Sequence, residues 1–360
     1  KPDENKGFGG GAIPRQSVFT KTCIIDSNKH RSNTMNDILF GIGAIIVGIA
    51  ASWGLYWVLD FLVRLLPVKT QERLRAFSFL LPALVLLILI SVIPFFQTIV
   101  WSFFDKKGKE FIGVENYVTL FTDNNFLGIL LNNFLWVAFV PVITVGFGLI
   151  AANLSNNVGP RREKIMKSLI FMPMSISFVS AATIWAYFYE SPPPGRPQIG
   201  LLNAIVEAFG GEAQSWLLMD AGRLNSFLLM IVVVWLNAGF SMVMLSSAIK
   251  AVPEETIEAA RIDGAGPFKI FIGVIIPQIR GTIMSVFITT VIGVMKVFDV
   301  VLAMTGGNFN TSVLGFAYYR ELFVNSNFGS ASAVVTILCV LIAPLMWLQI
   351  RSVRSVEENR

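Results

Sequence analysis

Long apolar segments alternate with short polar segments along most of the chain. A helix that crosses a lipid bilayer needs about 20 apolar residues, because each residue adds about 1.5 Å of length. Seven segments reach that length without a run of charge, so the pattern predicts about seven transmembrane helices and an all-α, polytopic membrane fold. The predicted spans are approximately residues 38–59, 77–100, 126–154, 165–189, 227–249, 283–303 and 331–350.

The composition agrees with this membrane pattern. Of the 360 residues, 54% are hydrophobic and 14% are charged, and the mean hydropathy is +0.66. A soluble globular chain carries about 25% charged residues, so the surface of this chain would hold too little charge for water. The composition therefore excludes an ordinary soluble enzyme, a disordered protein and a coiled coil.

The basic residues of the connecting loops are divided unequally between the two sides of the predicted bundle. One set of alternate loops, with the C-terminal tail 351–360, carries 15 Lys and Arg residues, and the other set carries 6. Cytoplasmic loops are enriched in Lys and Arg, so the first set and the C-terminus are predicted to be cytoplasmic. The net charge of +5 is thus explained without a nucleic-acid partner.

The first 34 residues fit this orientation poorly. They are polar, and Lys29 and Arg31 lie close to the first span, where positive charge favours the inside. Met35 is a plausible start directly before the apolar run. Residues 1–34 are either a disordered tail or an upstream extension, or a genuine tail that the cell translocates. Residues 35–75 are expected to form an extra N-terminal transmembrane helix and a cytoplasmic connector.

Few residues are available for acid–base, nucleophilic or metal chemistry. Cys23 and Cys339 are far apart in the sequence, and His30 lies outside every apolar segment. This excludes a disulfide framework, a Cys-rich zinc site and a Ser-His pair within the membrane. No catalytic residue, metal ligand or bound cofactor is predicted, and the chain is not expected to be an enzyme.

The segment after the fifth span has the pattern of a short helix–turn–helix at the cytoplasmic surface. Pro253 suits the first helical position, and the two glutamates that follow it lie at the positive end of the helix. Asp263-Gly264 is expected to end this helix, because glycine accepts positive φ. Pro267 is expected to begin the second helix.

The same segment carries a long motif with fixed spacing. Glu258-Ala259-Ala260, Gly264 and Val274-x-Ile276-Pro277 resemble the EAA loop of ABC importer permeases, E-A-A-x3-G-x9-I-x-L-P. Val and Ile stand here in place of the usual Ile and Leu, which are conservative replacements. The alternative interpretation is an amphipathic connector without a partner.

Further segments resemble the carbohydrate-importing, maltose-permease-like branch of this family. Residues 111–117 resemble its F-x-G-x-x-N-Y pattern, and residues 296–299, followed by 305–307, resemble its K-V-F-D and T-G-G patterns. Residues 168–173 and 199–203 resemble the alpha-glucoside branch.

The resemblance implies one subunit of a larger assembly in the bacterial cytoplasmic (inner) membrane. A permease domain over about residues 76–350 would supply six of the helices, with the coupling loop at 251–277. A second permease subunit, expected to be a different chain, would join two ABC ATPase subunits and an extracytoplasmic solute-binding protein. The implied function is ATP-driven import of a di- or oligosaccharide of the alpha-glucoside class.

The coupling loop is implied to seat in a groove of the ATPase. The glutamate would make a charge-assisted contact, and the two alanines would permit close approach. The chain has no GxxxxGK[ST] phosphate loop, so ATP and Mg²⁺ are expected to be used by the partner ATPase. The implied coupling residues are Glu258, Ala259, Ala260, Asp263, Gly264 and Pro277.

A sugar pathway requires amide, hydroxyl and aromatic groups within the spans. Polar residues inside a span usually face the bundle or a wet cavity. Asn237 and Ser241 are four residues apart and share a helix face beside Phe240, and the sixth span carries Thr290 and Lys296. These five residues are the candidate pathway. The alternative stays open that such side chains bond their own helix or join neighbouring helices.

Lys296 and Asp299 are three residues apart, so they are expected to pair along the predicted helix. A structural ion pair near the outer interface is favoured over a proton relay. The alternative function for the whole chain is a secondary transporter or channel that works without an ATPase. Such a protein would carry acids in its spans and an inverted repeat, whereas Asp299 is the one acid in the predicted spans.

Overall fold

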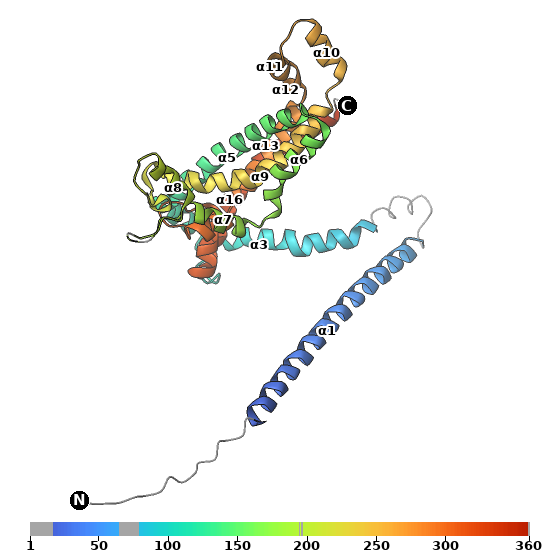
Figure 1. The fold of residues 1–360 in the computed structure, drawn as a ribbon. Coiled ribbons are helices and arrows are strands. Elements are labelled where there is room, and N and C mark those ends of the chain that lie inside the picture. Colours follow the sequence, from blue (N-terminus) through green and yellow to red (C-terminus); the bar gives the residue numbers. More distant parts are fainter. Residues whose placement is uncertain (1–16, 65–78, 194, 196, 359–360) are drawn as a thin grey trace, which may run out of the picture. The chain divides into compact units, whose positions relative to one another are not determined.

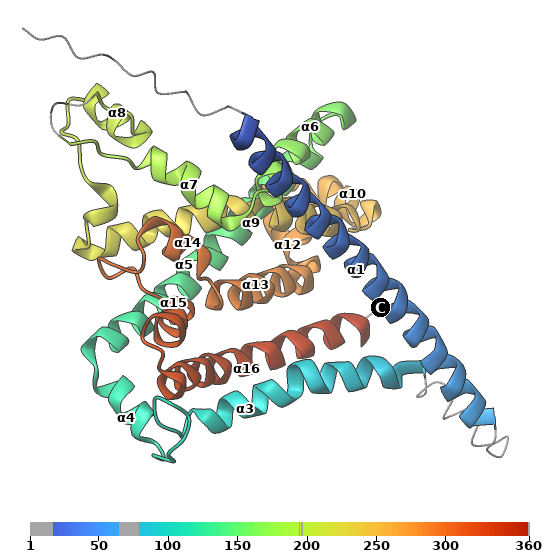
Figure 2. The same cartoon turned by 90° about the horizontal axis from the view of Figure 1, so that it is seen from below.

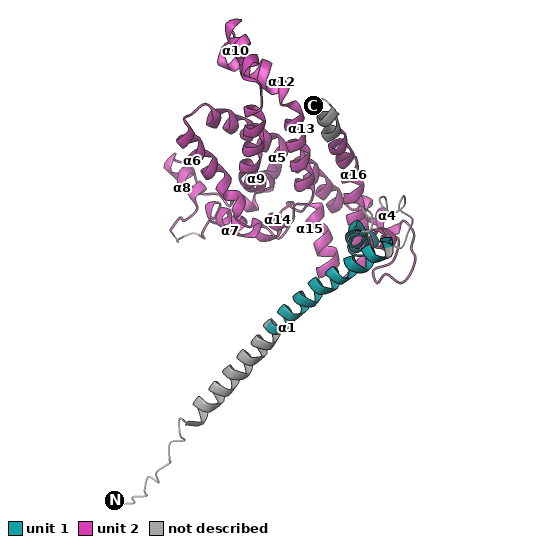
Figure 3. Cartoon of the chain, turned by 90° about the vertical axis from the view of Figure 1, so that its right-hand side faces the viewer, with its two compact units in different colours: residues 1–93 teal, residues 94–360 magenta. Residues whose placement is uncertain are grey.

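The computed structural model describes residues 17–64, 79–193, 195 and 197–358. The chain divides into two compact units, residues 1–93 and 94–360, which are described separately (Figure 3). Every named element in the described residues is a helix, and the one β-bridge there joins Phe104 and Phe111. The predicted all-α class is therefore confirmed.

The first unit is dominated by a single long helix, α1 (Ser17–Arg64) (Figure 1). Between Leu39 and Phe61 no residue of α1 is buried, and large apolar side chains are exposed along it. A helix that is apolar all round is typical of a membrane span. Residues 17–34, assigned above to a tail, are part of α1. Residues 1–16 and the predicted boundary after residue 75 lie outside the described residues.

The boundary between the units falls inside the apolar helix Phe79–Trp101, which contains the π-helical turn η1 (Ile88–Val92) and ends as α3 (Ile93–Trp101). The remaining α-helices of the second unit are α4 (Glu115–Thr122), α5 (Asn124–Asn156), α6 (Pro160–Phe171), α7 (Phe178–Phe188), α8 (Leu201–Ala208), α9 (Leu224–Lys250), α10 (Glu254–Ile262), α11 (Pro267–Ile270), α12 (Ile276–Gln278), α13 (Arg280–Met295), α14 (Asp299–Met304), α15 (Leu314–Tyr319) and α16 (Phe328–Glu358). Shorter turns are η2 (Met172–Ser175), η3 (Trp216–Leu218), η4 (Ala221–Arg223), η5 (Phe271–Ile275) and η6 (Arg320–Val324).

Five helices in the described residues are long and apolar enough to cross a membrane, and two bent helix pairs bring the total to seven if each pair is one span. The predicted span 165–189 is such a pair, because α6 with η2 meets α7 at 102°. The span is therefore broken rather than one continuous helix. Pro173 lacks an N–H group, and Ser177 begins α7 by accepting a hydrogen bond from the N–H of Ser180 at 3.2 Å.

The predicted span 283–303 also differs from the structure. α13 ends at Met295, and a new helix, α14, begins at Asp299 after Phe298 leaves the helical region at φ −149°. The turn is held by a close approach of Gly315, where an added Cβ would lie 2.6 Å from the carbonyl oxygen of Val297. α13 is itself bent by 72° from the preceding segment Pro267–Gln278.

α5 and α9 make the most extensive helix contact of the second unit, and α13 packs against α5 (Figures 1 and 2). Trp136 of α5 and Leu229 of α9 are completely buried in one core cluster. Small residues bring the two backbones together, since a Cβ on Gly148 would lie 2.2 Å from the Oγ of Ser241. The bent helices α6, α7 and α13 pack against this pair.

Candidate transport pathway and coupling loop

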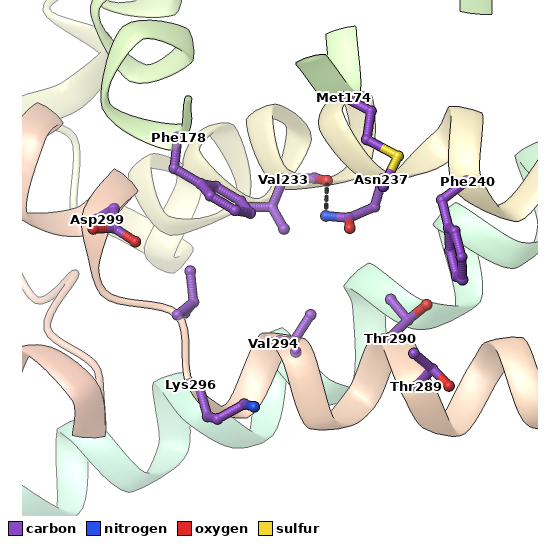
Figure 4. A pocket seen from close by; sticks show the side chains of 12 residues that line it. Met174, Phe178, Val233, Asn237, Phe240, Thr289, Thr290, Val294, Lys296 and Asp299 are labelled. Carbon is purple, nitrogen blue, oxygen red and sulfur yellow. Dashed lines mark hydrogen bonds between the residues drawn. The ribbon is translucent and has the colours of Figure 1, made fainter. Parts of the chain in front are cut away.

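A cavity of about 360 Å³ lies between η2, α7, α9 and α13 (Figure 4). Four of the five predicted pathway residues line it, and Asp299 lines it as well. The sequence reasoning missed Met174 and Phe178, which reach the cavity because the helix breaks between them. The four predicted residues are Asn237, Phe240, Thr290 and Lys296.

Asn237 supplies an oriented polar group in an otherwise apolar part of the cavity. Its amide nitrogen donates to the carbonyl of Val233 at 2.8 Å, which holds the side chain against α9. No described residue donates to its side-chain oxygen, which lies toward the cavity between Phe178 and Phe240 (Figure 4). Aromatic walls with a few placed polar groups are typical of sites for small organic molecules.

Two threonines of α13 line the opposite wall. The hydroxyl of Thr290 donates to the carbonyl of Val286 at 2.8 Å, so this residue bonds its own helix, as the alternative interpretation held. The hydroxyl of Thr289 accepts a hydrogen bond from the amide of Gln349 at 3.0 Å. Gln349, which the sequence analysis did not single out, thereby connects α16 to the cavity wall.

The expected ion pair between Lys296 and Asp299 is not formed. The described side chains contain no hydrogen bond or salt bridge between the two, and Figure 4 shows the Lys296 amine directed away from Asp299. The i, i+3 spacing does not bring the two side chains together because the helix is broken between them: Lys296 follows the last residue of α13, and Asp299 begins α14. Both residues still line the cavity from its α13–α14 side.

Ser241 does not line the cavity. It is completely buried against Gly148 of α5, and its hydroxyl has no hydrogen-bond partner among the described residues. Four residues turn a helix about 40° beyond a full circle, since each residue turns it about 100°. That rotation is enough to place Asn237 at the cavity and Ser241 in the contact with α5. The prediction that both residues line the pathway because they share a helix face was therefore too coarse.

The segment 251–277 folds as the predicted helix–turn–helix. Pro253 is the residue just before α10 rather than its first residue, and Glu254 and Glu255 occupy the first turn. Asp263 ends α10, and Gly264 follows at φ +78°, which other residue types rarely adopt. α11 then begins at Pro267, as predicted.

The predicted coupling residues divide between the two faces of α10. Glu258 and Ala259 are exposed, as are Asp263 and Gly264. Ala260 is half-buried and packs, with Ile257, against the cluster that contains Ile270. Ala260 therefore supports the loop itself, and the face open to a partner is the one that carries Glu258 and Ala259.

Pro277 has a different position from the rest of the motif. It lies exposed in α12, directly before the 72° bend that leads into α13. Its place in the motif is consistent with its effect on the backbone, because proline removes one helical hydrogen bond.

A polar cluster that the sequence reasoning missed ties the helices beneath the coupling loop. Glu163 of α6 accepts hydrogen bonds from Lys167 and Lys250, the latter at the end of α9. Lys167 also donates to Asn156 of α5 at 3.2 Å, and to Ser246 of α9. The i, i+4 spacing of Glu163 and Lys167 is the one part of this cluster that the sequence signals.

At the other end of α5, two buried asparagines bind the segment 305–314. The Asn132 amide nitrogen donates to the carbonyl of Asn310 and to that of Ser312, the latter at 2.9 Å. The side-chain oxygen of Asn133 accepts the N–H of Leu314 at 2.6 Å. These asparagines join α5 to a segment distant in the sequence, and we call these contacts the amide network.

The amide network holds a backbone that is otherwise unfavourable. Phe309 and Asn310 have φ values of +52° and +58°, which residue types other than glycine rarely adopt. Asn225 donates to the carbonyl of Phe309 at 2.7 Å, and Arg223 donates to the side-chain oxygen of Asn132 at 2.6 Å. These bonds fix the loop that follows the T-G-G pattern.

The F-x-G-x-x-N-Y segment has a structural explanation of the same kind. Asn116 donates to the carbonyls of Ser102 and Phe104 at 2.9 and 2.8 Å, and the hydroxyl of Tyr117 donates to that of Ser102 at 2.6 Å. In the turn before it, the N–H groups of Glu110 and Lys109 donate to the Asp105 carboxylate and lower its pKa.

Comparison with known proteins places the chain in a family. Residues 144–358 match the family described as the inner membrane component of binding-protein-dependent transport systems. The chain belongs to this family. It is 40% identical over 325 residues to the alpha-glucoside transport system permease protein AglF of Rhizobium meliloti, covering 88% of this chain and 96% of that protein. It is 45% identical over 279 residues to the osmoprotective compounds uptake permease protein GgtC of Synechocystis sp., covering 78% and 99%.

The fold is also that of a solved transporter. A bacterial ABC transporter involved in the import of the acidic polysaccharide alginate has a chain that matches with a TM-score of 0.69 and 18% identity. The match covers 79% of this chain and 97% of that chain. This family member is therefore an integral membrane permease component with the fold of an ABC importer subunit.

Proposed function

We propose that the chain is the permease subunit of an ATP-driven importer and that its cargo is an α-linked di- or oligosaccharide. The carrying observation is the cavity between α7, α9 and α13, in a chain 40% identical to an alpha-glucoside permease. Two phenylalanines and one oriented amide suit a neutral sugar, whose ring faces are apolar and whose edge carries hydroxyls. Lys296 and Asp299 add a donor and an acceptor on the same side.

The coupling loop supports a partner with a complementary groove. Glu258 and Ala259 face away from the bundle, and the large apolar side chains of Ile262 and Phe268 are 86% and 76% exposed. Exposed apolar residues around one charge are typical of an interface core. The partner is an ABC ATPase subunit, which uses the ATP and Mg²⁺, because this chain lacks a phosphate loop.

The proposed orientation has the coupling loop and the C-terminus in the cytoplasm. The excess of Lys and Arg in that set of loops supports it. The amide network then lies at the extracytoplasmic end, where a solute-binding protein delivers the sugar. A second permease subunit, a different chain, would close the cavity from its open side.

Transport by the complete assembly tests this function. We expect vesicles that contain both permeases and the ATPase to accumulate an α-linked disaccharide such as maltose only with ATP and the binding protein. A β-linked disaccharide such as cellobiose is the matched control and should be accumulated at least tenfold more slowly. Accumulation with a non-hydrolysable ATP analogue, driven by an ion gradient, would instead indicate a secondary transporter.

A further inference from the structure

A second cavity, of about 420 Å³, lies beside the amide network and away from the transport cavity. It is formed by the first turns of α5, by the segment 307–312, and by two arginines that come from distant parts of the sequence, Arg223 before α9 and Arg320 at the start of η6. The two cavities share no lining residue. Nothing in the proposed transport cycle uses this second one, which we call the arginine pocket.

The arginines bring positive charge, and neither forms an ion pair with a described acid. Arg223 makes three side-chain hydrogen bonds, all from one nitrogen and all to uncharged oxygens, those of Gly128, Asn132 and Asn310. The guanidinium of Arg320 makes no hydrogen bond or ion pair with any described residue. Guanidinium groups with free donors match the two oxygens of a carboxylate.

A buried hydroxyl in the lining independently indicates a missing ligand. Ser312 is 7% exposed, and its Oγ has no hydrogen-bond partner among the described residues. Its neighbour in space, Asn132, is 1% exposed and already bonded, so the pocket has a rigid polar floor. A buried polar group without a partner costs free energy, which a ligand oxygen accepting from this hydroxyl would remove.

The charge of the lining selects the class of ligand. Besides the two arginines, the lining contains one acid, Asp123, whose carboxylate accepts the N–H of Asn125 and caps α5. The formal charge of the lining is therefore one positive charge, and the positive end of the α5 dipole adds to it. Outside the lining, the Asp220 carboxylate accepts a hydrogen bond from the Asn310 amide at 3.1 Å, which limits the positive excess further. A group with a single negative charge fits this balance better than a doubly charged phosphate.

We propose that the arginine pocket binds a carboxylate, with Arg320 and Arg223 as its cationic donors and the Ser312 hydroxyl as a third donor. The carboxylate belongs either to a free sugar acid or to an acidic side chain of a protein that docks at this end. The binding of a carboxylate does not rest on the proposed function, because binding can be measured without transport; only a source in the solute-binding protein does.

Glucuronate and glucose form a matched pair of probes, since they differ in one carboxylate. We expect the purified complex in nanodiscs to bind glucuronate at least tenfold more tightly than glucose at low salt, and less tightly as salt is added. Arg320→Gln should remove this difference, Arg320→Lys should retain part of it, and Ser312→Ala should weaken glucuronate binding severalfold. Arg280→Gln, which removes the same charge at the other end of the molecule, is the control.

Equal binding of the two probes, or an Arg320→Gln complex that binds glucuronate as well as the parent, would overturn the proposal. Thermal unfolding of each variant separates loss of the site from loss of the fold. The source of the carboxylate follows from competition. If it comes from the binding protein, glucuronate raises the concentration of that protein needed for half-maximal ATPase stimulation, and Arg320→Gln abolishes the effect. A free acid as ligand gives no such competition.

Discussion

The amide network and the coupling loop lie at opposite ends of the second unit and are held in opposite ways. Asn132 and Asn133 are almost completely buried and bond the backbone of a loop with left-handed residues. α10 is instead exposed along most of its length and lies over a cavity of about 550 Å³ lined by Ile257, Arg261 and Phe268.

This difference separates a backbone that the chain's own side chains hold in place from a helix that few contacts hold. A buried amide loses free energy unless it is bonded, so the amide network fixes one backbone arrangement without outside help. A helix with few buried side chains gains little from its own bundle. The coupling loop therefore leaves apolar surface exposed, which the proposed ATPase partner would cover, and the predictions below test this contrast.

The largest effect is expected from Glu258→Lys, which reverses the exposed charge of α10. We expect it to abolish ATP-dependent uptake while the thermal unfolding midpoint stays unchanged, because this side chain has no partner within the described part of the chain. Glu254→Lys on the first turn is the matched control and should reduce uptake far less. Normal uptake by Glu258→Lys would contradict the proposed coupling role.

Asn132→Ala should have the largest effect on stability. It leaves the carbonyl of Ser312 without its donor, removes one of the two donors to the carbonyl of Asn310, and removes an acceptor of Arg223, so we expect a loss of about 3 kcal/mol in unfolding free energy. Asn157→Ala, at the exposed opposite end of α5, should cost little. Similar unfolding free energies for the two variants would contradict the proposed difference between the two ends of α5.

Gly148→Ala tests the close contact of α5 and α9 that connects the two ends. The new Cβ would meet the Oγ and Cβ of Ser241 at 2.2 and 2.6 Å, so we expect a loss of about 2 kcal/mol. Ser241→Gly in the same chain should restore most of it, whereas Ser241→Ala should not, because its Cβ remains. Denaturant unfolding in detergent measures the stability of all three variants. An unchanged unfolding free energy for Gly148→Ala would show that the two helices can move apart without cost.

Asn237→Ala should act on transport without changing the fold. The amide bonds only its own helix and offers its oxygen to the cavity, so we expect the KM for the sugar to rise about tenfold with an unchanged unfolding midpoint. An unchanged KM would show that the sugar does not contact this side of the cavity.

Asp105→Asn should have the smallest effect, since the residue is exposed in a turn. The backbone N–H groups of Glu110 and Lys109 lower the pKa of Asp105 below its ordinary value of 3.8. A lowered carboxyl pKa stabilises the fold above the unfolded pKa and loses that contribution as pH falls through the folded value. The small stability difference between parent and variant should therefore be constant at neutral pH and disappear as the pH falls below 3.8 and through the folded pKa. A difference that persists in stronger acid would have another cause.

Local chemistry explains which parts of the structure the sequence predicts well. Apolar runs of sufficient length identify the long helices, and the proline and glycine positions of 253–267 identify the coupling loop with its turn at Gly264. These features depend on neighbours in the chain, so periodicity and residue type are sufficient. The excess of Lys and Arg in one set of loops can likewise be counted without tertiary information.

The sequence by itself determined that this chain is helical, suited to a membrane, and equipped with an EAA-type turn. Only the tertiary structure decided which polar residues share a site. It placed Asn237 at the cavity and Ser241 in the contact with α5, broke the helix between Lys296 and Asp299, and brought Arg223 and Arg320 to one pocket. Such groupings depend on where helices bend and on close contacts between distant segments, and neither leaves a periodic signal in the chain.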